Sequence, residues 1–325
     1  IVDNMGNTAD VICYQGNGAS YATLKELNAS NADMFIAVTN SDELNILSCM
    51  TAHMMGAKHT IARVRDVDYA SQNRFYKDKL GLSMTINPEL ATALEVYRLL
   101  RFPLATRVEV FAGGRAELVE MSVKEGSPLS EKTLIEINQS MGINLLICAV
   151  VRDGEAFVPK GDTRLHSGDI LYLTGAAEEF RKSFKKLKLP VKPLQNVMIS
   201  GGGRISSYLA NVLIKQGATV TIVEKSKALA EELSGNIPKA AVMCDDTLAY
   251  FDSMSGSDIA NTDAFIALTE NDEYNLVAAM YAESQGVSKV VSRISAKSRL
   301  KVLQPESRIC TVCREDVAAD RILGY

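Results

Sequence analysis

The stretch NVMISGGGRISSYLANVLIKQGATVTIVEK, residues 196–225 of 325, decides the fold. A short apolar run (196–200) leads into three glycines (201–203), then a helical pattern (207–216), a second apolar run (219–223) and the acid Glu224. Strand, glycine turn, helix, strand and acid within about thirty residues form the fingerprint of a dinucleotide-binding Rossmann unit. Glycines let backbone N–H groups approach a pyrophosphate at the positive end of the helix. We therefore predict a doubly wound parallel α/β sheet.

The acid and one missing glycine refine this prediction. Glu224 lies 21 residues after Gly203, at the spacing expected of an acid that accepts hydrogen bonds from ribose hydroxyls. An acid here favours an unphosphorylated ribose, as in NAD or ATP, over NADP. Ser206 replaces the third fingerprint glycine, which weakens the argument for close helix–strand packing. The alternative interpretation is a Rossmann unit that has kept its fold and lost its ligand.

An internal repeat indicates that the chain carries two such units. Residues 31–63 align with residues 261–293 at a spacing of 230, and thirteen of 33 positions are identical. The shared polar residues include Asp33/Asp263, Thr39/Thr269, Asp42/Asp272, Glu43/Glu273, Asn45/Asn275 and Arg63/Arg293. Polar identities in a single register indicate a duplication rather than two similar core elements.

Each copy predicts a strand, a helix and a second strand. The apolar runs 34–38 and 264–268 fit strands buried on both faces, as in a parallel sheet. The helices run to Gly56 and Gly286, and strands at 59–64 and 289–294 follow through right-handed crossovers. We interpret Asp42 and Asp272 as helix caps first and ligand contacts second.

The first copy has no glycine loop in this sequence. Asp3 aligns with Glu224, and Asp3 to Asn17 spans 14 residues where Glu224 to Asp245 spans 21. A parallel sheet without its first strand and a crossover helix should not fold alone. We therefore expect the natural protein to have residues before position 1, between positions 3 and 11, and after position 325. The second site is the safer prediction.

A series of motifs carries a resemblance to a known family. They are IVD (1–3), GNG (16–18), ADMFIAVTNSDELN (32–45), IARVR (61–65), SPLSEKTL (127–134), PKGDTRLHSGDILYLTG (159–175), GGGRI (201–205), IVEK (222–225) and ALTENDEYN (267–275). In these motifs and their order, across essentially the whole chain, the sequence resembles the Trk potassium-uptake regulators, a family of paired KTN/RCK domains. The family order is nucleotide domain, small C-terminal domain, then both again, and the last part is absent here.

The resemblance implies two Rossmann-like doubly wound parallel-sheet domains with a small α+β RCK C-terminal-type domain between them. The expected boundaries are 1–104, 105–190 and 191–325. A helical pattern at 88–102 would end the first Rossmann unit, and turn signals at 113–114, 153–154 and 167–169 mark the strand-rich middle domain. A proline-stiffened linker at 189–193 precedes the second unit.

The resemblance also implies two sets of nucleotide-binding residues. In the first site these are Asp3, Asn17, Gly18, Thr39, Asn40 and Arg63. In the second site they are Gly201, Gly202, Gly203, Arg204, Ile205, Glu224, Asp245, Asp246, Thr269, Glu270 and Arg293. Cys244 stands where the family has the glycine of a G-D-x-T stretch, which puts the backbone contact there in doubt.

Composition and the remaining reactive residues exclude other classes of protein. The net charge is −4 and both signs are mixed along the chain, so there is no clustered basic surface of the kind that binds nucleic acid. The apolar runs are too short for a membrane-spanning helix. The six scattered cysteines are typical of reduced cytosolic thiols. His53, His59 and His166 form no dyad, and the single Cys310–Cys313 pair lacks further zinc ligands. We predict no catalytic and no metal-binding residues.

The resemblance implies a cytoplasmic, nucleotide-sensing regulatory subunit rather than an enzyme. It would bind NAD(H) and/or ATP/ADP, lie at the inner face of the cell membrane as a homodimer or tetramer, and gate a TrkH-like potassium transporter or channel. Arg63, Arg204 and Arg293 are the expected phosphate sensors, because a guanidinium binds phosphates with two parallel hydrogen bonds. Two alternatives stay open: an NAD-dependent oxidoreductase, and an assembly scaffold whose sites bind nothing.

Overall fold

The computed structural model describes residues 10–66, 69, 72–102, 104–111, 115–142, 145–187, 194–254, 259, 261–295 and 309–325. Asp3, predicted for the first site, lies outside these residues. Contacts divide the chain into a first unit, Ile1–Ala91 with Glu315–Tyr325, and a second unit, Thr92–Arg314. Within the described residues, none of the helices has the length and apolar character needed to cross a membrane.

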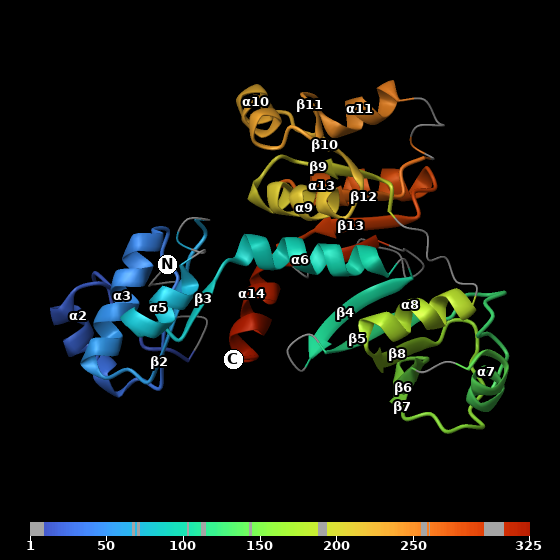
Figure 1. Cartoon of the computed structure of the whole chain (residues 1–325), viewed down its shortest axis with the longest axis horizontal. Coiled ribbons are helices and arrows are strands. Elements are labelled where there is room, and N and C mark those ends of the chain that lie inside the picture. Colours follow the sequence, from blue (N-terminus) through green and yellow to red (C-terminus); the bar gives the residue numbers. More distant parts are fainter. Residues whose placement is uncertain are drawn as a thin grey trace. The chain divides into compact units, whose positions relative to one another are not determined.

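The first unit contains a parallel three-stranded sheet in the order β1-β2-β3 (Figure 1). Its elements are α2 (Tyr21–Glu26), a 3-10 helix (Ala29–Asn31), β1 (Met34–Ala37), α3 (Asp42–Met55), β2 (His59–Arg63), α5 (Asn73–Leu80), β3 (Met84–Ile86), the start of α6 (Pro88–Arg101) and most of α14 (Arg314–Leu323). The predicted strand–helix–strand order is confirmed, and α3 stops at Gly56 because that glycine adopts φ 120°.

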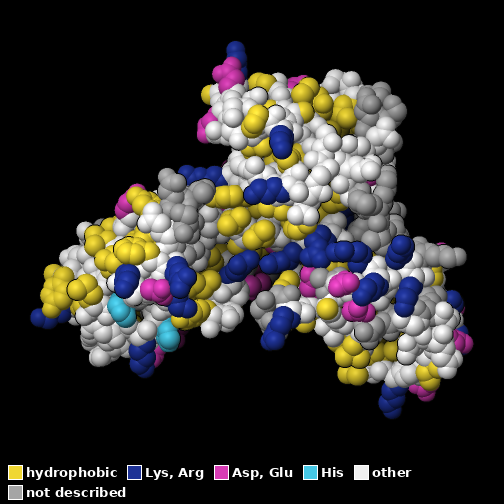
Figure 2. All heavy atoms as spheres, in the orientation of Figure 1, with side chains coloured by type: hydrophobic (Ala, Val, Ile, Leu, Met, Phe, Trp, Pro, Cys, Tyr) yellow, Lys and Arg dark blue, Asp and Glu magenta, His cyan; other side chains and the backbone are white. Residues whose placement is uncertain are grey.

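One prediction about this sheet is wrong. The first apolar run was expected to be buried on both faces, but Met34 and Ile36 of β1 are 41% and 42% exposed. Among the described residues β1 pairs with β2 alone, so it is an edge strand of the described sheet. Figure 2 shows hydrophobic side chains gathered on this unit over α2 and α3, where Tyr21, Leu47 and Met54 are exposed.

The second unit begins with an antiparallel sheet in the order β4-β5-β8-β6-β7. Its elements are β4 (Ala105–Phe111), β5 (Ala116–Ser122), α7 (Leu134–Met141), β6 (Leu146–Arg152), β7 (Glu155–Phe157), β8 (Ile170–Gly175) and α8 (Ala177–Lys186). Two predicted turns are confirmed at 153–154 and 167–168, and the one at 113–114 lies outside the described residues. Asp169, buried before β8, forms a two-pronged ion pair with Arg152 and so fixes the second of these turns.

The same unit contains a parallel six-stranded sheet in the order β11-β10-β9-β12-β13-β14. Its elements are β9 (Asn196–Ser200), α9 (Arg204–Lys215), β10 (Thr219–Val223), α10 (Lys227–Asn236), β11 (Ala241–Met243), α11 (Thr247–Ser253), β12 (Ala264–Ala267), α13 (Asp272–Ser284), β13 (Lys289–Arg293) and β14 (Ile309–Val312). Every residue of β12 is buried, as predicted.

The strand order of this sheet reverses at β9. The chain winds outward from β9 through β10 to β11 and then returns to β12 on the other side of β9. This reversal is the point of a doubly wound sheet where ligands bind.

Candidate functional site

The glycine turn lies where the strand order reverses, directly after β9. Gly201 adopts φ +93°, and a Cβ there would stand 3.1 Å from the Thr269 nitrogen and 3.2 Å from the Leu268 carbonyl carbon. A Cβ on Gly202 would stand 2.4 Å from Leu233 Cδ1. A Cβ on Gly203 meets nothing within 4 Å. Glycine is therefore required at Gly201, a side chain at Gly202 would need Leu233 to shift, and the turn lies directly against the loop after β12.

Glu224, at the end of β10, is hydrogen-bonded to this turn. One carboxylate oxygen accepts from the Gly202 N–H at 2.6 Å, and the other accepts from the Ser226 N–H at 2.6 Å. The predicted ribose acid and the predicted phosphate loop thus form one hydrogen-bonded group. A ligand that reaches Glu224 necessarily lies beside the glycine turn.

The two residues after the glycines have different surroundings. Arg204 is exposed in the first turn of α9, which begins three residues earlier than the sequence pattern predicted, because Gly203 serves as its N-cap. Ile205 is 5% exposed and packs into the core. Of these two, Arg204 has the side chain that can reach an anion at the helix N-terminus.

A buried asparagine links the ends of β12 and β13. Asn275 Oδ1 accepts from the Thr269 N–H at 3.0 Å and from the Thr269 hydroxyl at 2.6 Å. Its Nδ2 donates to the Thr269 and Arg293 carbonyl oxygens at 2.9 and 3.1 Å. These bonds use the backbone N–H and hydroxyl of Thr269, so this predicted ligand contact also has an internal structural role.

Arg293 ends β13 and forms an ion pair at the carboxyl edge of the sheet. Its guanidinium donates to both carboxylate oxygens of Glu270, at 2.7 and 3.0 Å. The arginine side chain is 3% exposed, whereas that of Glu270 is 85% exposed. The hydrogen bonds from Arg293 lower the pKa of Glu270. The stabilisation from this pair is therefore present above the ordinary carboxyl pKa and is lost as pH falls through the lowered value.

The acidic residues after β11 adopt a capping arrangement. Asp246 caps α11 by accepting from the Leu248 N–H at 3.0 Å, and the Tyr274 hydroxyl donates to the same oxygen at 2.8 Å. Burial works to raise the pKa of Asp246, but these hydrogen bonds outweigh it and the pKa is lowered. Asp245 is exposed and accepts from the Asp246 N–H. This leaves Asp245 as the more accessible of the two predicted contacts.

The first copy repeats the asparagine link. Asn45 Oδ1 accepts from the Thr39 N–H and hydroxyl, both at 2.7 Å, and its Nδ2 donates to the Thr39 and Arg63 carbonyl oxygens at 3.1 and 2.9 Å. The structure therefore brings Thr39 and Arg63 together as predicted. Asn17 is exposed in the turn that leads to α2, where its side chain accepts from the Ala19 N–H.

The arginine of the first copy has a different partner. Arg63 lies 3.9 Å from Glu89, measured from Nη2 to Oε1. The position of Glu270 is taken by Asn40, whose carbonyl oxygen accepts from Arg65 Nη2 at 2.5 Å. Arg65 also lies 3.5 Å from Asp42, so both arginines of the first copy have an acidic partner other than the residue aligned with Glu270.

The capping roles assigned from the sequence to Asp42 and Asp272 are wrong. Ser41 and Asn271 are the side-chain N-caps of α3 and α13. Asp42 instead accepts from the Arg65 and Asp66 N–H groups, and Asp272 accepts from the Ser295 N–H. Both acids thus fix the segment after the next strand.

Ser206, at the third fingerprint position, is a buried hydroxyl without a hydrogen-bond partner among the described residues. An unsatisfied buried polar group costs about 1–3 kcal/mol. We expect Ser206→Ala to raise the free energy of unfolding by about 1 kcal/mol, measured by urea denaturation. Ser206→Gly should gain less, because glycine inside a helix costs about 1 kcal/mol relative to alanine. A loss of stability in the alanine variant would show that the hydroxyl is satisfied in solution.

The histidines and cysteines give no second kind of site in the described part of the chain. His53 lies in α3, His59 begins β2 and His166 precedes a turn, as predicted. The cysteines there are free, and no group of three or more His, Cys, Asp or Glu side chains could hold a metal ion.

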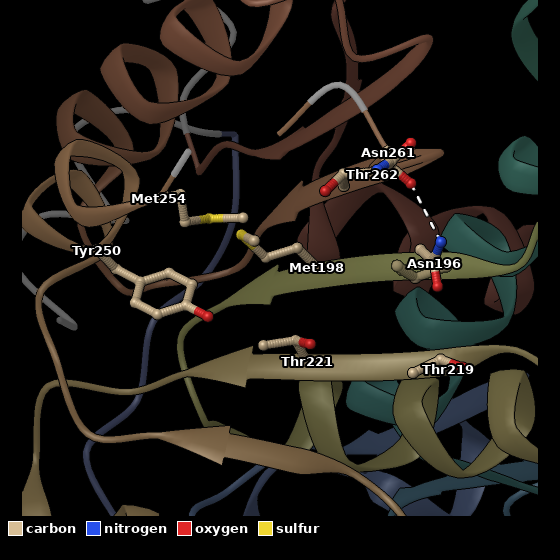
Figure 3. A pocket seen from close by; sticks show the side chains of 9 residues that line it. Asn196, Met198, Thr219, Thr221, Tyr250, Met254, Asn261 and Thr262 are labelled. Carbon is tan, nitrogen blue, oxygen red and sulfur yellow. Dashed lines mark hydrogen bonds between the residues drawn. The ribbon is translucent and has the colours of Figure 1, made fainter. Parts of the chain in front are cut away.

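A cavity of about 170 Å³ lies away from the glycine turn. Figure 3 shows Asn196, Thr219 and Thr221 on β9 and β10, with Tyr250 and Met254 opposite them. Asn196 and Thr219 are the first residues of their strands, so the cavity extends toward the amino end of the sheet. The predicted binding residues lie at the carboxyl end, and none of them lines this cavity.

Two domains of one protein family match segments of this chain. The TrkA-N domain matches residues 2–88 and 197–312, and the TrkA-C domain matches residues 118–188. A Trk system potassium uptake protein TrkA homolog from Archaeoglobus fulgidus is 31% identical over 91% of this chain and 66% of its own length. TrkA from Vibrio alginolyticus is 30% identical over 91% of this chain and 65% of its own length. The chain thus spans slightly less than two thirds of these relatives.

Solved structures share the fold. The GsuK RCK domain superposes with a TM-score of 0.67 at 19% identity, covering 99% of this chain and 68% of that one. The GsuK channel bound to NAD gives a TM-score of 0.69 at 19% identity, covering 99% of this chain and 56% of that one. At this level of identity the likeness establishes the fold alone.

Proposed function

Because this chain belongs to the TrkA family of Trk potassium uptake proteins, we propose that it is a nucleotide-sensing regulatory subunit of a potassium transporter. In this role it acts at the cytoplasmic face of the membrane, as part of a homo-oligomer, on a TrkH-like membrane subunit. It binds NAD(H), ATP or ADP at the carboxyl edges of its parallel sheets. A nucleotide changes the transporter only through a difference in affinity between two arrangements of the protein.

The observation that carries this proposal is the hydrogen bond between Glu224 and the Gly202 N–H at 2.6 Å. It joins a ribose-binding acid and a diphosphate-binding turn at the reversal point of the second sheet. Arg204 follows that turn, exposed in the first turn of α9, where its guanidinium can meet a phosphate. The solved GsuK structures include complexes with NAD and with ADP, which supports a nucleotide ligand here.

An NAD-dependent oxidoreductase is the alternative that the Rossmann fold itself leaves open. The relatives are named as potassium uptake proteins, which favours regulation over catalysis. Measuring nicotinamide reduction with a panel of small alcohols and hydroxy acids tests this alternative. Steady turnover with any of them would contradict the regulatory proposal.

Calorimetric titration of the protein with NAD, NADH, ATP and ADP tests the binding site. We expect at least one nucleotide to bind, and Glu224→Ala to weaken its second-site affinity by about tenfold or more, because a charged hydrogen-bond acceptor is lost. Glu232→Ala, which removes an exposed acid from α10, is the matched control and should change nothing. Equal binding by wild type and Glu224→Ala would refute the site.

A further inference from the structure

The two copies differ at the residue that faces their shared arginine. The repeat aligns Arg293 with Arg63 and Glu270 with Asn40. In the second copy the arginine donates to a carboxylate at 2.7 and 3.0 Å. In the first copy the aligned residue is neutral, and the arginine lies 3.9 Å from Glu89, a residue of α6. At this one aligned position, the second copy therefore carries a negative charge and the first copy a neutral amide.

Glu270 lies next to the place where a bound diphosphate ends. A Cβ on Gly201 would be 3.1 Å from the Thr269 nitrogen, so the glycine turn is in contact with the residue before Glu270. Arg293 Nη1 is 3.3 Å from the Thr269 carbonyl oxygen, on the far side of that loop. A nucleotide with its ribose on Glu224 and its diphosphate on the glycine turn therefore extends its next group over Glu270 and Arg293.

The chemistry of that next group separates two classes of ligand. In a nucleoside triphosphate it is a third phosphate, which meets the exposed Glu270 carboxylate and competes with it for Arg293. Like charges at this range repel, and the phosphate gains little from a guanidinium that is already paired. In a dinucleotide it is a second ribose, whose hydroxyls donate hydrogen bonds to a carboxylate.

We propose that Glu270 makes the second site selective for a dinucleotide over a nucleoside triphosphate. The inference rests on the proposed function, since it requires that the second site bind nucleotides. The selectivity comes mainly from repulsion between the Glu270 carboxylate and the third phosphate of a nucleoside triphosphate. In the first copy, Arg63 and Arg65 lie 3.9 and 3.5 Å from Glu89 and Asp42, and the residue aligned with Glu270 is the neutral Asn40.

Exchanging the repeat residues tests the proposal. The affinities of wild type, Glu270→Asn and Glu270→Gln for NAD and for ATP are measured by titration calorimetry at one ionic strength. The second-site component is the one that Glu224→Ala removes. We expect the ratio of ATP affinity to NAD affinity to rise by about tenfold in both variants, the asparagine reproducing the first copy and the glutamine preserving length. Glu232→Gln, an equal charge change on α10, should leave the ratio unchanged.

The outcomes distinguish this inference from the function on which it rests. If both nucleotides bind the wild type and neither Glu270 variant changes the ratio, the selectivity proposal is overturned and the nucleotide site stands. If neither nucleotide binds the wild type, both are overturned. If Glu232→Gln changes the ratio as much as Glu270→Asn, the effect is one of net charge, and the specific role of Glu270 is refuted.

Discussion

Gly201→Ala is expected to lower nucleotide affinity at the second site by about a hundredfold, because Gly201 begins the turn that is proposed to bind the diphosphate. The backbone at Gly201 has φ +93°, a conformation that costs a residue with a side chain about 1–2 kcal/mol. Its added Cβ would also press on Thr269 and Leu268 at 3.1 and 3.2 Å, and both contacts are with backbone atoms that cannot rotate away. The turn must therefore move away from the loop after β12, which displaces the proposed diphosphate site.

Gly217→Ala provides the control for backbone strain. Gly217 has φ +89°, and a Cβ there would meet nothing within 4 Å. The two variants should lose similar amounts of unfolding free energy to strain, but only Gly201→Ala should lose nucleotide binding. Binding is measured by titration calorimetry and stability by urea denaturation. Wild-type affinity in Gly201→Ala would mean that the turn does not contact the ligand.

The second Rossmann unit could be predicted almost completely from the sequence. Its strands are continuous apolar runs, and its glycines and acid stand at a spacing that few other folds use. The structure gives a physical reason for the first two glycines: Gly201 needs positive φ, and a Cβ on Gly202 would lie 2.4 Å from Leu233 Cδ1. The family resemblance named Arg293 as a contact of the second site, and in the structure this residue lies beside the loop after β12.

The polar links between strand ends could not be predicted in this way. The repeat aligns Asn45 with Asn275, but this alignment does not reveal which groups each side-chain amide is hydrogen-bonded to. The four partners of Asn275 are three backbone groups and one hydroxyl, which leave no mark on the sequence. Asp42 and Asp272 were misassigned for the same reason, since their partners are N–H groups about twenty residues away.

The charge difference between the two edges was also hidden. Glu270 was grouped with Asn40 by alignment, and only the geometry shows that its carboxylate holds Arg293. The exposure of β1 was missed because an apolar run predicts a buried strand without saying how many neighbours the strand has. Both failures concern partners distant in sequence, and local patterns carry no information about these.

Asn275→Ala is expected to destabilise the second unit by about 3–5 kcal/mol, a loss typical of a broken buried polar network. Asn275 has no exposed surface and makes four hydrogen bonds that join Thr269 to Arg293. Its removal leaves one N–H and two carbonyl groups without these partners inside the protein, and each buried unsatisfied group costs about 1–3 kcal/mol. Urea denaturation followed by circular dichroism measures the loss.

Two further variants distinguish the loss of this buried hydrogen-bond network from the loss of a side-chain amide alone. Asn211→Ala removes an exposed amide with one hydrogen bond, to the Ser207 carbonyl oxygen, and should cost less than about 0.5 kcal/mol. Asn275→Asp keeps the acceptor that Thr269 uses but sets a carboxylate oxygen against two carbonyl oxygens, so it should be no more stable than the alanine variant.

Because Asn45 makes the same four bonds in the first unit, Asn45→Ala should destabilise that unit comparably. A loss below about 1 kcal/mol in both alanine variants would mean that water replaces the amide and that the strand ends do not depend on it.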